Sequence, residues 1–124
     1  MAEYRISSHP ILAAKPRPQV TFCWQDQTIT ALAGETIASA LFANGIRIFG
    51  HHPKDGSPQG IFCANGQCAQ CLVLADGMPV KSCMEPVRED MRVEPVNTLP
   101  ELPKVATPPP MAEVQEIEIP VLII

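Results

Sequence analysis

The sequence is short of several features that mark common protein classes. No apolar run approaches the roughly 20 residues that a membrane-spanning helix needs. The N-terminus, MAEYRISSHP, has no apolar stretch like that of a secretory signal peptide, so a cytoplasmic location is expected. Lysine and arginine number 9 against 13 aspartates and glutamates, and this acidic balance argues against nucleic acid as a partner.

Recognisable catalytic motifs are also missing. The chain has no Gly-x-Gly-x-x-Gly fingerprint, no Ser/His/Asp set and no carboxylate pair in a known motif. It is therefore not expected to be a catalyst alone. Aromatic residues make up only 5%, which predicts a mostly aliphatic core, and 14 prolines argue against a helical bundle.

The pattern along the 124 residues predicts one small domain followed by a tail. We expect the domain to cover residues 1–95 and a Pro-rich linker to cover 96–115. Residues 116–124 (EIEIPVLII) turn abruptly apolar and are typical of the first buried strand of a truncated dinucleotide-binding domain. An extra strand of the present domain is the alternative.

Within the domain, alternating and helical patterns predict an α+β fold. Alternating or apolar runs predict strands, and one stretch with helical spacing follows a plausible N-cap, Thr36. The helix is expected at 36–44, a loop at 51–66, and strands at 19–24, 28–32, 46–49, 71–75, 80–82 and 91–94. Two hairpins around one helix favour a mixed sheet with one main helix.

Four of the five cysteines have a spacing with a specific chemical meaning. Cys63, Cys68 and Cys71 form a C-x4-C-x2-C run, and Cys83 follows across the second predicted hairpin. This is the spacing of plant-type [2Fe–2S] sites. Four thiolates are needed to hold two tetrahedral irons, three from one loop and the fourth from another element.

The residues around these cysteines suit a loop that wraps closely around a charged cluster. Gly60 and Gly66 allow close approach of the backbone, and Ala64 and Ala69 are small enough to do the same. No Lys or Arg lies between residues 61 and 80, so backbone N–H groups rather than ion pairs are expected to stabilise the negative charge.

Alternatives remain open for the cysteines and for other polar residues. Structural zinc and disulfides are the other uses of such cysteines. Cys23, next to Trp24, is expected to be a buried core thiol. His51 and His52 are expected to be solvated. The cations near the cysteines are expected to be ordinary solvated charges, with a docking face as the alternative: Arg47, Lys54, Lys81 and Arg88.

Several segments together resemble a known family. The helix GETIASALFANGI, the loop GIFCANGQCAQC, the hairpin LVLADGMPVKSC and the tail MEPVREDMRVEP occur in this order. They are similar to the ferredoxin-like [2Fe–2S] domain of multi-subunit FAD-dependent amino-acid and amine dehydrogenases. That family includes hydrogen cyanide synthase small subunits, opine oxidase, proline or hydroxyproline dehydrogenase subunits, and the N-terminal part of sarcosine oxidase alpha subunits.

The resemblance implies a β-grasp fold of the plant-type ferredoxin kind and one-electron transfer by a [2Fe–2S] cluster. It implies that Cys63 and Cys68 hold one iron and that Cys71 and Cys83 hold the other. It also implies a flavoprotein domain or subunit as partner, with FAD bound there and not in this chain. A structural or assembly domain, with zinc or no metal at the four cysteines, is the alternative function.

Overall fold

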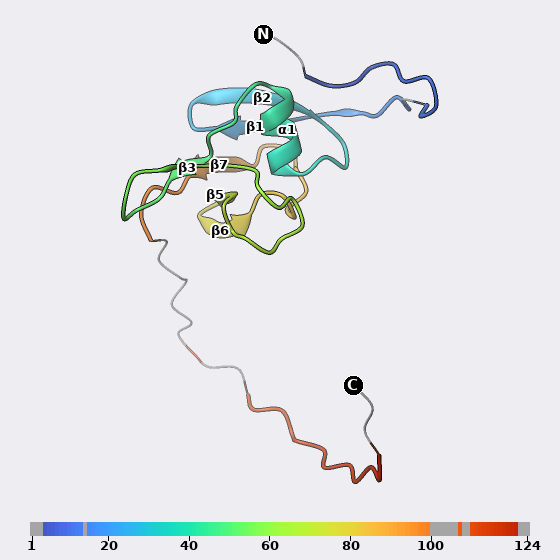
Figure 1. Cartoon of the computed structure of the whole chain (residues 1–124), viewed down its shortest axis with the longest axis vertical. Helices are drawn as coiled ribbons and strands as arrows, with labels where there is room; N and C mark the ends of the chain where they lie inside the picture. The colour runs from blue at the N-terminus through green and yellow to red at the C-terminus, as the bar shows by residue number, and fades with distance from the viewer. Residues whose placement is uncertain (1–3, 14, 100–106, 108–109, 122–124) are drawn as a thin grey trace.

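The fold is built on a five-stranded mixed sheet (Figure 1). The computed structural model describes residues 4–13, 15–99, 107 and 110–121. The sheet has the strand order β2-β1-β7-β5-β6, and β3 and β4 form a separate two-stranded ribbon. The elements are β1 (Gln19–Trp24), β2 (Gln27–Leu32), α1 (Ile37–Ala43), β3 (Gly50–His51), β4 (Pro58–Gln59), β5 (Leu72–Ala75), β6 (Met78–Lys81) and β7 (Arg92–Pro95).

Two tight turns make the hairpins of this sheet. The turn between β1 and β2 is Gln25-Asp26, one residue earlier than the sequence suggested, and Gln25 has a φ of 53°. Asp76 and Gly77 join β5 to β6 with φ values of 50° and 81°. Positive φ at both central residues matches the strand twist, which is why Asp-Gly is favoured there. Strand β7 then enters between the hairpins, parallel to β1 and antiparallel to β5.

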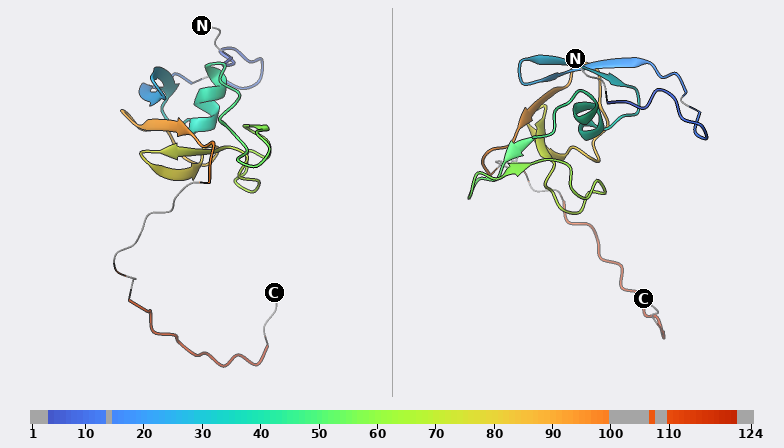
Figure 2. Two further views of the ribbon diagram at one scale, coloured as in Figure 1. Left: turned by 90° about the vertical axis from the view of Figure 1, so that its left-hand side faces the viewer. Right: turned by 45° about the horizontal axis from the view of Figure 1, so that its top comes forward.

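Helix α1 lies across one side of the sheet (Figure 2). Thr36 caps its N-terminus, and Thr36 and Ser39 exchange side-chain and backbone hydrogen bonds in a capping box. Ile37, Ala40 and Leu41 are fully buried, as their helical spacing predicted. The expected helix therefore agrees with the structure, with the two residues at its predicted ends acting as caps.

The core lies between α1 and the sheet and is mainly aliphatic, as expected. Phe22 and Trp24 of β1 are its aromatic residues from the sheet, and the Trp24 ring meets Phe49 edge to face with centroids 6.3 Å apart. The α+β class, with a mixed sheet and one main helix, is confirmed. The strand expected at 46–49 was wrong, because pairing begins only at Gly50, opposite Gln59. The β3–β4 ribbon also interrupts the loop expected at 51–66.

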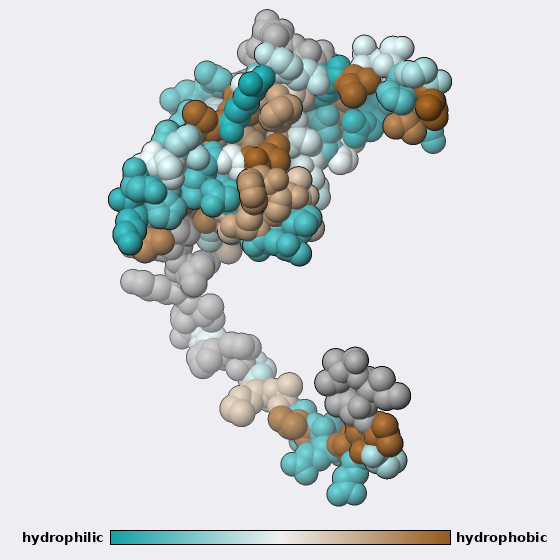
Figure 3. Space-filling model, in the orientation of Figure 1, coloured by the Kyte–Doolittle hydropathy of each residue, from teal (hydrophilic) through white to brown (hydrophobic). Residues whose placement is uncertain are grey.

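The C-terminal segment is exposed where it is described. Residues 110–121 run apart from the folded body in Figure 1, and none of them is in a strand. Figure 3 shows apolar residues beside polar ones along this segment, and Met111 is 95% exposed. An extra strand of this domain therefore does not form within 116–121. Residues 122–124, and linker residues 100–106 and 108–109, lie outside the described residues.

Among the residues that the structure describes, no helix combines the length and the apolar character needed to cross a bilayer.

Candidate metal centre

The four cysteines singled out from the sequence meet at the open end of the β5–β6 hairpin. Cys63 and Cys68 lie in the loop between β4 and β5, Cys71 directly precedes β5, and Cys83 follows β6. Because the first residue of β5 is paired with the last residue of β6, the segments with Cys71 and Cys83 leave the hairpin side by side. All four are free thiols; Cys71 is buried and the others are partly buried.

Backbone N–H groups surround the sulfur of Cys63. The N–H groups of Asn65 and Cys68 donate to Cys63 Sγ over 3.5 and 3.4 Å. These two hydrogen bonds are the main reason that the pKa of Cys63 falls to about 6, and the N–H of Gln67 adds a smaller effect in the same direction. Thiolates, not thiols, bind metals, so the loop prepares Cys63 as a ligand.

The loop achieves this arrangement through three residues in the left-handed conformation. Ala64, Gly66 and Ala69 have φ values of 53°, 81° and 56°. Such residues turn successive N–H groups toward one side and make an anion-binding concavity. The N–H of Gln70 likewise donates to Cys68 Sγ over 3.4 Å. For the two alanines this conformation costs about 1–2 kcal/mol each, a strain that concentrates at functional sites.

Cys71 and Cys83 form a second pair. The residue between β6 and Cys83 is Ser82, which is fully buried and donates its N–H and its hydroxyl to the Cys71 carbonyl, over 3.1 and 2.6 Å. Burial raises the pKa of Cys83, and the adjacent Cys71 thiol raises it further. The N–H of Gly66 also bonds to Cys83 and acts in the opposite direction.

The donor set fits a [2Fe–2S] cluster. Cys63 is hydrogen bonded to Cys68, and Cys83 to Cys71, while Cys83 is also close enough to Cys63 for their charges to interact. Four soft sulfur donors in two neighbouring pairs are what two tetrahedral irons require. The four thiols lie as two neighbouring pairs and not around a single point: in the described part of the chain, no three or more His, Cys, Asp or Glu side chains converge on one metal-ion position.

The two loop glycines lie close to other parts of the fold. A Cβ atom on Gly60 would lie 2.3 Å from the carbonyl oxygen of Arg47, so this end of the loop packs directly on the backbone that follows α1. A Cβ atom on Gly66 would lie 3.0 Å from Cγ of Met84, next to Cys83. Gly60 is thus packed against the Arg47 backbone, and Gly66 against the Met84 side chain.

Sequence reasoning missed two residues of this region. Lys81 was expected to be a solvated charge, but it is partly buried and its Nζ donates to the carbonyl of Gly66. Ser82 was not singled out at all. Its position directly before the candidate ligand Cys83 was the one feature of the sequence that could have drawn attention to it. Arg47 is not simply solvated either, because its guanidinium lies over the rings of Tyr4 and Phe42, 5.5 and 5.8 Å from their centroids.

Cys23 and the two histidines lie outside the site. Cys23 was expected in the core, but it is only partly buried, and its thiol donates to the carbonyl of Gln25 over 2.8 Å. His51 is exposed, as expected. His52 is partly buried and forms a 3.1 Å contact through Nδ1 with Asp55.

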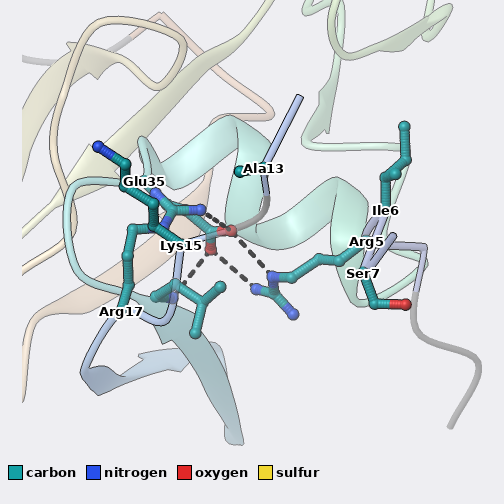
Figure 4. Close-up of a pocket in the computed structure, with 8 residues that line it drawn as sticks. Arg5, Ile6, Ser7, Ala13, Lys15, Arg17 and Glu35 are labelled. Carbon is teal, nitrogen blue, oxygen red and sulfur yellow. Dashed lines mark hydrogen bonds and ion pairs between the residues drawn. The ribbon is translucent and has the colours of Figure 1, made fainter. Parts of the chain in front are cut away.

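A pocket between the N-terminal segment and the turn before α1 contains an ion pair (Figure 4). Arg5 binds the buried carboxylate of Glu35 through two 2.8 Å hydrogen bonds, and Arg17 approaches the same group at 3.7 Å. Burial alone would raise the pKa of Glu35, but Arg5, the Leu32 N–H and Arg17 together bring it below its usual value. These contacts hold the side chains of Arg5 and Arg17 against Glu35, in the turn before α1.

Comparison with known proteins points to the same chemistry. The family described as "2Fe-2S iron-sulfur cluster binding domain" matches residues 17–98, which include all four cysteines of the site. The chain is 39% identical over 79 residues to the hydrogen cyanide synthase subunit HcnA of Pseudomonas aeruginosa, covering 63% of this chain and 75% of the relative. HcnA of Pseudomonas protegens is 33% identical over 76 residues, covering 60% of this chain and 71% of the relative.

A solved structure supports the fold. L-proline dehydrogenase from P. horikoshii superposes with a TM-score of 0.58 at 20% sequence identity. The match covers 70% of this chain but only 17% of the dehydrogenase chain. The likeness therefore extends to one small part of that protein.

Proposed function

Because this chain belongs to the family of 2Fe-2S iron-sulfur cluster binding domains, we propose that it transfers electrons one at a time within a larger flavin-dependent oxidoreductase. The observation that carries the proposal is the arrangement of four thiols in two pairs, with N–H groups directed at their sulfurs. A bound [2Fe–2S] cluster accepts and releases a single electron. The N–H groups of the loop offset the negative charge that this places near the sulfurs.

The proposed ligands are Cys63 and Cys68 for one iron, and Cys71 and Cys83 for the other. The loop positions Gly60, Ala64, Gly66 and Ala69 would hold the backbone around the cluster. Gly60 contributes by its close packing on the preceding chain, and the other three by their left-handed conformation. In this proposal the fold is the β-grasp of plant-type ferredoxins, and the parallel β1–β7 pair at the centre of the sheet supports it.

The proposed partner is a flavoprotein domain or subunit that binds FAD and oxidises a C–N bond of an amino acid or amine. The relatives support this: HcnA is a subunit of hydrogen cyanide synthase, and the structural neighbour is an L-proline dehydrogenase. Exposed apolar side chains flank the site, with Phe62 82% and Met84 58% exposed. Such side chains beside a redox centre suit a surface that a partner covers.

The proposal extends to the organisation of the chain and its location. Residues 1–95 would be the cluster domain, 96–115 a linker, and 116–124 the first strand of a following FAD- or NAD-binding domain. The alternating Glu and Ile residues of 116–119 are exposed, which suits a strand whose neighbours lie in another domain. A cytoplasmic location would keep the four thiols reduced and available to iron.

Anaerobic reconstitution with iron and sulfide tests the function. We expect two irons and two sulfides per chain, the visible absorption bands of a [2Fe–2S] centre, and an EPR signal after dithionite reduction. One zinc per chain, with neither bands nor signal, would instead support the structural alternative. Metal analysis of protein purified without reconstitution provides the control for adventitious iron.

A further inference from the structure

Lys81 makes an unusual contact with the loop that holds Cys63 and Cys68. Its Nζ, at the end of β6, donates to the carbonyl oxygen of Gly66 in a partly buried hydrogen bond. The ion pairs among the described residues involve Arg5, Arg17, His52 and Arg88, and Lys81 takes part in none of them. Among the described residues, no carboxylate oxygen lies within 4.0 Å of its ammonium group.

The peptide bond that Lys81 holds also carries an N–H group that bonds to another residue of the loop. The carbonyl of Gly66 and the N–H of Gln67 belong to one planar trans peptide, so they point in opposite directions. The Gln67 N–H donates to Asn65 Oδ1 over 3.3 Å, and the N–H of Asn65 donates in turn to Cys63 Sγ over 3.5 Å. Holding the Gly66 carbonyl therefore also holds the Gln67 N–H on Asn65, the residue whose own N–H is directed at the sulfur.

The residues that follow Lys81 make two further contacts with Gly66. The N–H of Gly66 bonds to Cys83, and the Met84 side chain lies against the Gly66 Cα. The carbonyl of Lys81 in turn accepts the N–H groups of Met84 and Glu85, over 2.8 and 3.2 Å. Lys81 thus organises the turn around Cys83 with its backbone and the loop around Cys63 with its side chain.

We propose that Lys81 is a positioning residue that raises the reduction potential of the bound [2Fe–2S] cluster. Its ammonium group holds the peptide between Gly66 and Gln67, which keeps Asn65 in place with its N–H directed at Cys63. It also polarises that peptide, which strengthens the hydrogen bond from Gln67 to Asn65. Its charge also favours the reduced form, which carries one more negative charge. The inference rests on the proposed function.

The potential of Lys81 variants tests this role. In Lys81→Met, which removes the charge and the donor, we expect the ratio of reduced to oxidised cluster at a fixed potential to fall about tenfold, equal to about 59 mV for a one-electron couple. Lys81→Arg should retain most of the wild-type potential. The matched control is Lys54→Met, which removes an exposed lysine from the turn between β3 and β4 and should leave the potential unchanged.

A second measurement separates this inference from the proposed function. In the metal-free protein, Lys81→Met should exchange the Gln67 amide hydrogen faster than Lys54→Met or wild type does. Failure of the wild type to bind any cluster would overturn the proposed function, and amide exchange would still test the contact of Lys81. A Lys81→Met cluster with the wild-type potential would overturn the inference. If Lys81→Met binds no iron, the comparison uses Lys81→Gln in its place. A cluster in Lys81→Gln with the same reduction potential as the cluster in Lys81→Arg would then overturn the inference.

Discussion

Ser82 binds the carbonyl oxygen of Cys71 twice, with its N–H at 3.1 Å and with its hydroxyl at 2.6 Å. The carbonyl of Ser82 in turn accepts the N–H of Ala38 in the first turn of α1. One buried residue thus connects two candidate ligand segments and the helix, although it binds no metal itself.

Ser82→Ala should therefore weaken both the fold and the site. Loss of the hydroxyl removes one of two buried hydrogen bonds to the Cys71 carbonyl, and we expect the free energy of unfolding to fall by about 1–2 kcal/mol. Urea unfolding of the metal-free protein measures this, with Ser57→Ala, at an exposed serine, as the control. Equal stability in the two variants would contradict a structural role for this hydroxyl.

The proposed ligand set predicts opposite outcomes for two cysteine variants. Cys68→Ser should lose the visible bands and most of its iron, because oxygen is a poor substitute for thiolate at an iron–sulfur cluster. Cys23→Ser should keep the bands and the iron. Cys23 lies in β1 and bonds to the carbonyl of Gln25 in the following turn, away from the other four thiols. Iron content after reconstitution is the measurement. Equal loss of iron in both variants would contradict the assignment.

The thiols of the metal-free protein should differ in reactivity. With a pKa of about 6, Cys63 is mostly thiolate at pH 7, whereas burial and the Cys71 thiol raise the pKa of Cys83 and keep it protonated. Iodoacetamide should therefore modify Cys63 before Cys83. The rate at Cys63 should fall as the pH drops below about 6, because the thiolate becomes protonated. Peptide mass spectrometry at several pH values measures this order, and faster labelling of Cys83 at pH 7 would contradict it.

Relief of backbone strain should be measurable at Ala64. Its φ of 53° lies in the left-handed region, which glycine adopts without a Cβ clash. We expect Ala64→Gly to raise the free energy of unfolding by up to about 1 kcal/mol. The control is Ala31→Gly in β2, where the buried alanine has an extended conformation, and this change should be destabilising. The same sign for both variants would show that strain at Ala64 has little effect.

The Arg5–Glu35 pair should make stability depend on pH in the acid range. Because the pKa of Glu35 is lowered in the folded protein, the contribution of Glu35 to stability is fully present above the unfolded pKa of about 4.3. That contribution is lost as the pH falls through the lower pKa of the folded protein.

Arg5→Ala should lower the free energy of unfolding by about 3 kcal/mol at pH 7, because it leaves a buried carboxylate without its main partner. Glu35→Gln should flatten the stability profile below about pH 4. Denaturant unfolding at pH 3 to 7 measures both effects, and an Arg5→Ala stability within a few tenths of the wild type would show that Arg17 is a sufficient partner.

Local patterns allowed much of the fold and the site to be predicted from the sequence. Thr36 and Asn44 bracket the helix because capping depends on residues close in the chain. Three of the four candidate ligands lie within nine residues, so their spacing alone indicated the chemistry. The strand expected at 46–49 was wrong because a strand requires a partner, and the apolar pattern contained no information about which segment pairs with Gln59.

The other differences between the expected and the observed structure have two causes: contacts between distant segments, and the alternation of side chains along a strand. Lys81 reaches Gly66 only because β6 returns beside the loop, which no local pattern reveals. For Cys23 a signal did exist: Phe22 and Trp24 are larger and both face the core, so a period of two places Cys23 on the other face. Ala64 and Ala69 were chosen for size, whereas their distinguishing property is backbone conformation.

The position of β7 has a consequence for the order in which the fold forms. The last strand of the sheet pairs with the first and separates the two hairpins, so neither hairpin has its neighbour until residues 92–95 have been synthesised. All four candidate ligands leave the ribosome before that strand. Assembly of the sheet is thus a late, long-range step, of the kind that slows folding. During synthesis the cysteines therefore precede the sheet that holds them together, and iron delivery to a complete site belongs after translation of this domain.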